Sequence, residues 1–207
     1  MDLYFAPMSC SLASRIALYE GNLAARFHAV TLATKTLADG SDYRSINPKG
    51  QVPALRLDDG SILTEGAAVL QYIADRAPDT GLAPAWGSSE RYALQTWLSY
   101  IGSEIHKQIY FTIFNPASPA EARDYAREVA APSKYDFLAA HLTERDVLVG
   151  DSFTVADAYL TVTLNWAQPA GIDLSPWPAV TAYHARHLAR PAVARALADD
   201  LAARTGV

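Results

Sequence analysis

The spacing of hydrophobic residues changes character near residue 90 of the chain. In the first part, short apolar runs bounded by turn residues predict strands at 2–6, 26–31, 53–57 and 61–63. Apolar positions at helical spacing predict helices over 11–20 and 65–77. The first part of the chain therefore alternates strands and helices.

Turn residues mark where these elements end. Gly21 follows the first helix at the position where a left-handed residue closes a helix. The Asp59-Gly60 step between two apolar runs is a strong hairpin signal. The segment 33–47 is polar and loop-like, with room for one helical turn. Together these signals predict an α/β domain of order β-α-β-α-β-β-α.

The second part of the chain is helical throughout. The expected helices cover 89–114, 119–142, 154–167, 176–188 and 191–203. Several begin near a proline, whose missing N–H costs nothing there, and Pro132 is placed to kink the second one. A stretch rich in Pro and Gly separates the two parts. We therefore expect a first domain at 1–78, a linker at 79–88 and an all-helical domain at 89–207.

Composition narrows the class of protein. The chain has 207 residues, of which 50% are hydrophobic, and a formal net charge of −5. Scattered basic residues argue against binding of nucleic acid, and no apolar run approaches the roughly 20 residues of a membrane span. The N-terminus lacks the pattern of a signal peptide, so a cytoplasmic location is expected. A single cysteine excludes an internal disulfide, and the pair His184 and His187 lacks further ligands, so no metal is expected.

Cys10 is the first candidate for chemistry. A lone cysteine is most often a buried, inert residue, but Cys10 falls between a predicted strand and a predicted helix. The first turn of a helix carries unpaired N–H groups and partial positive charge, which stabilise a thiolate and should depress the pKa of Cys10. No second cysteine follows three residues later, so the thiol can bind or activate only another molecule's sulfur.

Two further segments allow either a structural or a binding role. Pro53 can simply begin an edge strand, or the Val52–Pro53 bond can be cis and turn the backbone of Val52 outward to pair with an extended peptide. Thr64 and Glu65 can cap a helix. Alternatively, the Gly66 N–H can hold a carboxylate while Glu65 holds an ammonium, which fits the two charges of a γ-glutamyl group.

In the helical part, His106 lies on the long first helix, where a histidine is more often a surface or packing residue. Thr154 and Asp157 form a variant of the capping box, with Phe153 as a hydrophobic staple. We interpret this second motif as structural.

Taken together, these segments resemble the glutathione transferase family, and most closely its bacterial beta class. The matching segments are PMSCSL at 7–12, NPKGQVP at 47–53, LTEG at 63–66, SEIHK at 103–107 and GDSFTVADAYL at 150–160. Five motifs in this order are highly specific, and they span the chain. The resemblance implies a thioredoxin-like first domain that binds glutathione as a cosubstrate and a helical domain that shapes the second substrate's pocket.

The resemblance also assigns roles around the glutathione sulfur. It implies that Cys10 faces this sulfur, as a hydrogen-bonding thiol or in a mixed disulfide. Either Ser11 or Cys10 would donate to the thiolate, and the resemblance implies that His106 reaches toward it from the helical domain.

Other residues would hold the ends and the backbone of glutathione. The resemblance implies that the backbone of Val52 pairs with the cysteinyl part of glutathione. Gln51 and Pro53, whose peptide bond with Val52 would be cis, flank this residue and belong to the same binding segment. Glu65 and Gly66 would hold the γ-glutamyl end.

The remaining roles concern the glycine end and the subunit boundary. Lys35 would neutralise the glycine carboxylate, and Ser103 and Glu104 would contribute near the interface of a homodimer, Glu104 serving the neighbouring subunit's glutathione. Two residues depart from the family pattern: Met8 stands where Gly is usual, and Ser99 where the beta class has Asn. Met8 is expected to narrow the mouth of the site, and Ser99 to weaken binding.

These roles predict an enzyme that conjugates the glutathione thiol to small apolar electrophiles in detoxification. The candidate walls of the apolar pocket are Tyr110, Phe111, Phe114, Trp166 and Tyr4, with core packing favoured for Tyr4 and Trp166. Two alternatives stay open: a glutathione-dependent thiol-disulfide transferase that uses Cys10, and a non-catalytic glutathione-binding protein of the same fold.

Overall fold

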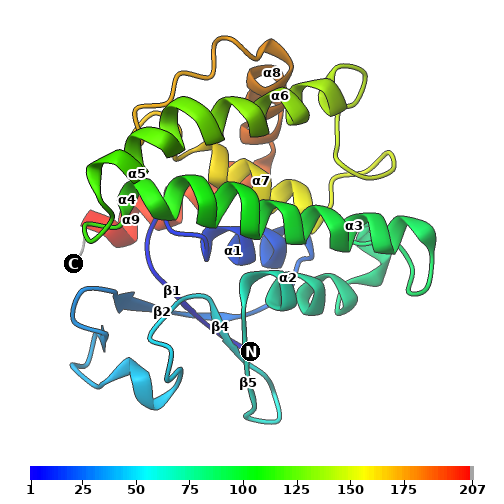
Figure 1. Cartoon of the computed structure of the whole chain (residues 1–207). Coiled ribbons are helices and arrows are strands. Elements are labelled where there is room, and N and C mark those ends of the chain that lie inside the picture. The colour runs from blue at the N-terminus through cyan, green and yellow to red at the C-terminus, as the bar shows by residue number, and fades with distance from the viewer. Residues whose placement is uncertain (206–207) are drawn as a thin grey trace. The chain divides into compact units, whose positions relative to one another are not determined.

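The computed structural model describes residues 1–205, which form two compact units. The first unit comprises Met1–Ala83 together with the chain from Arg190 onward, and the second comprises Pro84–Ala189. Figure 1 shows the elements of both. Among the described residues, no helix is long and apolar enough to cross a membrane.

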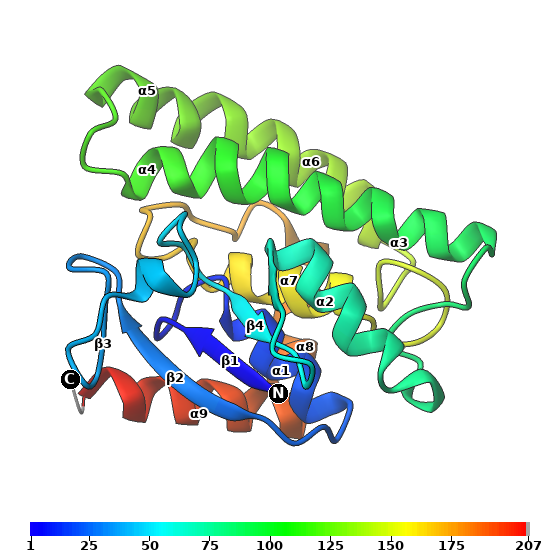
Figure 2. The same cartoon turned by 90° about the horizontal axis from the view of Figure 1, so that it is seen from below.

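The first unit is built on a five-stranded sheet of order β3-β2-β1-β4-β5 (Figure 2). The strands are β1 (Asp2–Phe5), β2 (Arg26–Thr31), β3 (Thr36–Leu37), β4 (Ala54–Arg56) and β5 (Ile62–Thr64). β1 and β2 run parallel, and the other neighbouring pairs are antiparallel. The sheet therefore joins a parallel half to an antiparallel hairpin.

Two helices follow strands of this sheet. They are α1 (Leu12–Glu20) and α2 (Gly66–Asp75), which contact each other as well as the sheet. Side chains alternate along β1, so Leu3 and Phe5 lie on the face opposite to Tyr4. Tyr4 packs in a separate cluster with Tyr43, whose ring centroid lies 5.8 Å away. Tyr43 begins the 3-10 helix η1 (Tyr43–Ser45), the single helical turn expected in the polar segment.

Two sequence expectations in this unit differ from the structure. The polar segment contains the short strand β3. Nothing in the sequence signals it, because a strand of only two residues has no recognisable apolar pattern. Gly21 does not adopt a left-handed conformation, because its φ is −78°; the left-handed residue is Asn22, with φ of 49°. Gly21 is instead required by space, since a Cβ there would lie 3.1 Å from the Cβ of Ala77.

The last helix, α9 (Pro191–Thr205), belongs to the first unit and not to the helical one. It packs on α1, beside which it lies in Figures 1 and 2. The Arg190 guanidinium donates to both carboxylate oxygens of Glu20, at 2.7 and 2.9 Å. The sequence pattern assigned this helix to the second domain because a helical period does not say which unit its apolar face covers.

The second unit is entirely helical in its described residues. The first long helix is continuous through α3 (Ser89–Tyr100), the π-helical segment η3 (Ile101–Phe111) and α4 (Thr112–Phe114). The second comprises α5 (Ala120–Tyr125), the π-helical segment η4 (Ala126–Ala130) and α6 (Ala131–Leu142), and the unit ends with α7 (Val155–Leu164) and α8 (Pro178–Leu188). Pro132 is the second residue of α6, just after η4, so the wider π turn lies where proline interrupts the regular hydrogen bonding.

The centre of this unit is α7, every residue of which is buried. The capping box expected from Thr154 and Asp157 is present. Asp157 does more than close the helix, because its carboxylate also accepts from the Leu148 N–H and the Tyr183 hydroxyl, both at 2.8 Å. The motif thus ties α7 to two other segments of its unit.

Candidate functional site

The turn between β1 and α1 holds Cys10, as the sequence predicted. Ser11 organises this turn: its hydroxyl donates to the Ala6 carbonyl at 3.2 Å and accepts from the Ala6 N–H at 3.1 Å. The Ser9 hydroxyl lies 2.7 Å from it. Because Ser11 is fully buried and engaged within the turn, its expected contact with glutathione stays a prediction.

Cys10 points toward a second segment of the first unit. Its half-buried thiol donates to the Val52 carbonyl, with Sγ 3.3 Å from the oxygen. The Val52–Pro53 peptide bond is cis. The structure therefore brings together the thiol and the backbone segment to which the sequence assigned complementary roles.

The neighbouring Gln51 is fixed through its backbone and leaves its side chain exposed. Its carbonyl accepts from the Tyr43 hydroxyl at 2.9 Å and from Asn47 Nδ2 at 2.6 Å. Burial raises the pKa of Tyr43 to about 12, so its hydroxyl remains a donor near neutral pH. These contacts hold the strand that leads into Val52.

Glu65 and Gly66 stand at the beginning of α2. Glu65 has φ of 72°, a conformation that is uncommon for a residue other than glycine, and its side chain is exposed. Its carboxylate pairs with the ammonium of Lys49, which also donates to the Thr64 hydroxyl at 2.9 Å. A Cβ at Gly66 would lie 4.0 Å from Pro53 Cδ, so the helix N-terminus and the cis-proline turn are neighbours.

Lys35, the residue before β3, approaches the same backbone. It also has a left-handed backbone, with φ of 61°. Its aliphatic chain lies over Gly50, where an added Cβ would come within 3.2 Å of Lys35 Cδ. The chain is thus directed along the segment that continues into Gln51.

The first unit therefore gathers one thiol, the cis-proline backbone segment, one carboxylate and two cations. Such a set suits a short, extended peptide that carries an ammonium and carboxylates, since each charge finds an opposite partner. The end of a helix adds backbone donors for a carboxylate. The roles of Cys10, Lys35, Gln51, Val52, Pro53, Glu65 and Gly66 toward such a ligand stay predictions.

In the second unit, His106 is held by aromatic residues. Its Nδ1 lies 2.7 Å from the Tyr159 hydroxyl, and the centroid of its ring lies 5.0 Å from that of Trp166. Burial, with a smaller contribution from the Lys107 charge, lowers the pKa of His106 to about 4. The ring is therefore neutral at pH 7, and a Tyr159 hydroxyl that donates to Nδ1 leaves the proton on Nε2, which can then donate.

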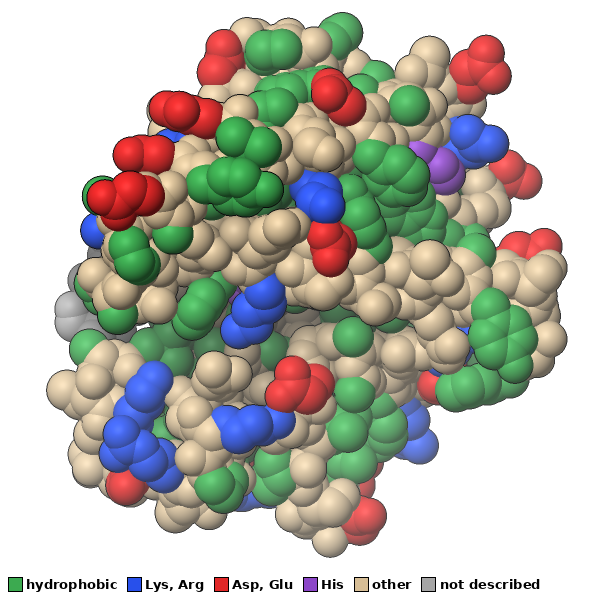
Figure 3. All heavy atoms as spheres, in the orientation of Figure 1, with side chains coloured by type: hydrophobic (Ala, Val, Ile, Leu, Met, Phe, Trp, Pro, Cys, Tyr) green, Lys and Arg blue, Asp and Glu red, His purple; other side chains and the backbone are tan. Residues whose placement is uncertain are grey.

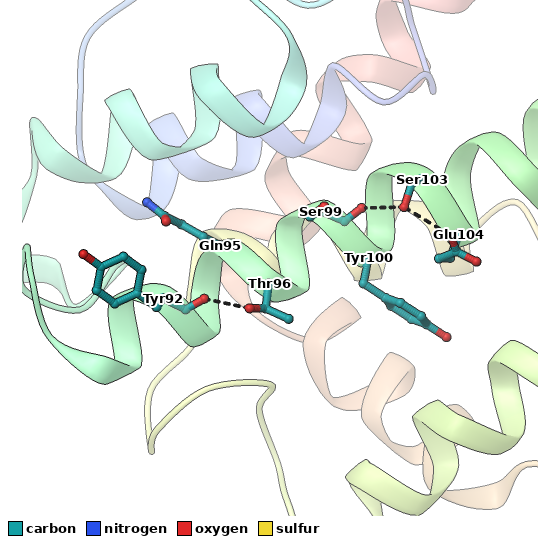
Figure 4. Close-up of a pocket in the computed structure, with 7 residues that line it drawn as sticks. All are labelled: Tyr92, Gln95, Thr96, Ser99, Tyr100, Ser103 and Glu104. Atoms are coloured by element: carbon teal, nitrogen blue, oxygen red, sulfur yellow. Dashed lines mark hydrogen bonds between the residues drawn. The ribbon is translucent and has the colours of Figure 1, made fainter.

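Ser103 and Glu104 lie on the exposed face of the same long helix. Figure 4 shows the hollow that they line along α3 and η3. The Ser103 hydroxyl donates to the Ser99 carbonyl at 3.0 Å, and Glu104 pairs with Lys134 at 2.7 Å. The hydrogen bond from Lys134 holds the pKa of Glu104 below its usual range.

The sequence did not single out two of these residues for a role. Lys49 lies in the NPKGQVP segment, where a lone surface lysine gives no signal of its partner. Tyr159 lies in the motif that we interpreted as purely structural, and only the fold brings it to His106. Their contacts join positions 16 and 53 residues apart in the chain.

Comparisons with known proteins agree over nearly the whole chain. Residues 7–76 match the model of the glutathione S-transferase N-terminal domain, and residues 91–191 match that of the C-terminal domain. The chain is 40% identical over 200 residues to the glutathione S-transferase GstA of Escherichia coli O157:H7, covering 97% of this chain and 98% of the relative.

Two solved structures are similar in both fold and sequence. The bacterial beta class glutathione S-transferase of Sphingomonas chungbukensis is 43% identical, with a TM-score of 0.93 over 97% of this chain and 98% of the other. A sphingomonad glutathione S-transferase in complex with glutathione is 44% identical, with a TM-score of 0.92 over the same shares of the two chains.

Proposed function

Because the chain belongs to the glutathione S-transferase family, in its bacterial beta class, and is a glutathione transferase, we propose that it conjugates the glutathione thiol to small apolar electrophiles. The family and the transferase activity follow from the matches over nearly the full length. The proposal concerns the residues that do the chemistry and the class of second substrate. Consumption of such electrophiles would make the reaction a detoxification.

The observation that carries the proposal is the hydrogen bond from the Cys10 thiol to the Val52 carbonyl beside the cis proline. An extended peptide that pairs with the Val52 backbone would place its own central side chain next to Cys10. For glutathione, that side chain is the cysteinyl thiol. Glu65 precedes Gly66, which lies beside Pro53, and its exposed carboxylate now pairs with Lys49; the γ-glutamyl ammonium would share this carboxylate with Lys49 or replace it.

The reaction needs the glutathione sulfur as a thiolate. A hydrogen bond from the Cys10 thiol, turned from the Val52 carbonyl to the glutathione sulfur, and the partial positive charge of the first turn of α1 would stabilise that charge. The thiolate then forms a bond to an electrophilic carbon. With an aryl halide the halide leaves with the electron pair of its bond, and the thiol proton passes to solvent.

His106 contributes as a neutral group in this proposal. With the proton on Nε2, it would donate a hydrogen bond to a developing or existing negative charge without itself carrying charge. Tyr159 would hold the ring in this tautomer through Nδ1. His106 thus acts on sulfur charge and not on the ends of the tripeptide.

An aromatic series in the second unit supports an apolar second substrate. The rings of His106, Trp166 and Tyr110 follow one another with centroids 5.0 and 5.5 Å apart, and Phe114 stacks on Tyr110 at 6.2 Å. Tyr110 is fully buried, whereas Phe111 and Phe114 are 46% and 47% exposed. The two phenylalanines therefore offer apolar surface, and Phe114 stacks on Tyr110, which in turn contacts Trp166.

A second candidate activity is thiol-disulfide transfer, which is suggested by the partial exposure of the Cys10 thiol. The Cys10 thiolate would attack a glutathione mixed disulfide, forming a Cys10–glutathione disulfide and releasing the substrate as a thiol. A second glutathione would then regenerate Cys10 and leave as oxidised glutathione. The half-buried thiol is open enough for this exchange.

Alkylation of Cys10 tests the proposed site. Since the chain has one cysteine, one added iodoacetamide label, measured by mass spectrometry, reports Cys10 alone. We expect rapid labelling at neutral pH and protection by a saturating S-alkylated glutathione, which cannot consume the reagent, because its bound sulfur would lie against Cys10. Slow labelling that S-alkylated glutathione does not change would refute the assignment.

We also propose a two-fold homodimer that uses the exposed face of the helical unit. Trp97, Tyr100 and Phe137 form an aromatic cluster there, with Phe137 5.7 and 5.1 Å from the other two rings and 53% exposed. Figure 3 shows this apolar patch over α3 and α6. We propose that a second copy of this chain covers this patch. Ser103 and Glu104, for which the resemblance implies a place near the interface of a homodimer, line the adjoining hollow. Light scattering should report a dimer that Phe137→Glu converts to monomer; a wild-type monomer at micromolar concentration would refute it.

We also propose that the protein is located in the cytoplasm. A free thiol persists in a reducing compartment, and the reaction consumes reduced glutathione. Fractionation of the source cells, followed by immunodetection, would test it.

A further inference from the structure

A buried carboxylate of α9 holds the turn that carries Cys10. Met8 has a left-handed backbone, with φ of 60°. Its N–H donates to Asp200 Oδ2 at 2.8 Å, across 192 positions of the chain. A left-handed conformation is unfavourable for a residue with a side chain, so the turn depends on contacts that fix it.

The second oxygen of this carboxylate is also engaged. Arg15 Nε lies 2.9 Å from Asp200 Oδ1, and Asp200 is 0% exposed. The Arg15 guanidinium lies 4.2 Å from the ring centroids of both Phe5 and Phe27. A carboxylate is costly to bury unless it is paired and hydrogen-bonded, and here one oxygen faces a cation while the other faces the Met8 amide.

The rest of α9 is fixed independently of this contact. Arg190 pairs with Glu20 at the beginning of the helix. The Tyr19 hydroxyl donates to Asp199 at 2.6 Å. Loss of the Asp200 carboxylate would therefore not remove all the contacts that hold α9 on α1.

We infer that Asp200 is a positioning residue for Cys10, by which the last helix sets the conformation of the turn that presents the thiol. The inference rests on the proposed role of Cys10. Residue 200 lies outside both segments that match the family models, which end at 76 and 191. The helix beyond residue 191 thus has a functional contact in addition to its packing.

Three variants separate positioning from stability. Asp200→Ala removes the acceptor of the Met8 N–H as well as the charge facing Arg15. Asp200→Asn can keep an acceptor for Met8 but leaves the Arg15 cation with only the Asp199 carboxylate, 3.9 Å away. Glu20→Gln weakens the other end of α9 and does not touch the Met8 turn, so it is the control for loosened docking.

The measurements are the iodoacetamide labelling rate of Cys10, the KM for glutathione and the melting temperature. We expect Asp200→Ala to change the labelling rate and the KM by about fivefold, the factor that one ordinary hydrogen bond supplies. Asp200→Asn should lose stability yet keep a labelling rate close to wild type. Glu20→Gln should keep both the labelling rate and the KM at wild-type values. A labelling rate and KM unchanged in Asp200→Ala, or changed equally in Glu20→Gln, would overturn the inference.

A double variant covers the case in which Asp200→Ala does not fold. Arg15→Met with Asp200→Leu replaces the buried ion pair by apolar side chains, which proteins often tolerate, and still removes the acceptor for Met8. It should show the same change in labelling, and wild-type labelling in the folded double variant would overturn the inference. Because labelling needs neither glutathione nor turnover, it tests Asp200 separately from the proposed function, which fails instead if S-alkylated glutathione does not protect wild-type Cys10.

Discussion

The Cys10 region of the first unit and the His106 region of the second are built in different ways. Around Cys10, backbone groups make most of the contacts: the Val52 carbonyl, the Gln51 carbonyl and the Met8 amide all take part. Around His106, side chains do so, with one hydroxyl on Nδ1 and one indole against the ring.

The two regions therefore differ in which of their contacts a single substitution can remove. A backbone carbonyl survives a change of its own side chain, so the Cys10 region is sensitive mainly to residues that shape the turn or carry charge. The His106 region depends on the side chains themselves. Substitutions in the two regions should therefore separate effects on thiol chemistry and glutathione binding from effects on turnover.

The largest effect is expected at Cys10. Cys10→Ala and Cys10→Ser should both lose thiol-disulfide exchange completely, because neither side chain can form a mixed disulfide. Conjugation should persist in part, since the first turn of α1 and His106 remain. Assays with a mixed disulfide and with an aryl halide separate the two activities. Exchange that survives in Cys10→Ser would show that the reaction does not use this thiol.

Next comes Glu65, the charged residue of the proposed binding region. At a glutathione concentration about 100 times Kd, wild type should gain about 2.7 kcal/mol of stability. Glu65→Ala should abolish most of that protection, because a hydrogen bond to a charged group contributes about 1.5–3 kcal/mol. Differential scanning fluorimetry with glutathione measures it.

Glu65→Gln is the matched control for this prediction. It keeps the shape and the acceptor oxygen but lacks the negative charge that pairs with an ammonium. It should fall between wild type and Glu65→Ala. If Glu65→Ala is protected as strongly as wild type, the ammonium site has been assigned to the wrong residue.

A smaller effect, on turnover only, is expected at His106. His106→Ala should lower kcat by about tenfold or more, near the lower range for a positioned acid or base, and should leave the Kd for glutathione nearly unchanged. Tyr159→Phe removes only the hydroxyl beside Nδ1 and should cost about fivefold. Steady-state kinetics and calorimetry measure the two quantities. Equal losses of kcat and of affinity would place His106 in binding instead.

The smallest effect concerns pH and the protonation of buried histidines. Burial lowers the pKa of both His106 and His184 to about 4, and His184 Nε2 lies 2.8 Å from Asn165 Oδ1. Between pH 6.5 and pH 4 the unfolded chain therefore binds protons that the folded chain does not, so stability falls as pH decreases through this window. One such histidine contributes about 1 kcal/mol between pH 6.5 and pH 5.5.

Urea unfolding at pH 7, 5.5 and 4.5 tests this expectation. His184→Asn should show a shallower loss of stability than wild type, and adding His106→Asn should flatten the curve further. Identical pH dependence in wild type and the double variant would show that these rings are not the groups that resist protonation.

Much of the first unit could be predicted from the sequence because its signals are local. Apolar runs, the Asp59-Gly60 turn and the N-terminal turn of α1 act over a few residues, and four of the five strands follow from them. The position of Cys10 between a strand and a helix, the capping box at Thr154 and the turns near prolines are equally local. Such features depend on backbone conformation and on hydrogen bonds between near neighbours.

Other features required the tertiary structure because they join distant segments. No local pattern links Met8 to Asp200, Lys49 to Glu65 or Tyr159 to His106, and a helical period does not assign α9 to the first unit. The low pKa of His106 likewise comes from burial by residues far along the chain. The sequence by itself determined most of the elements and the candidate thiol, whereas their partners were decided by which apolar faces pack together.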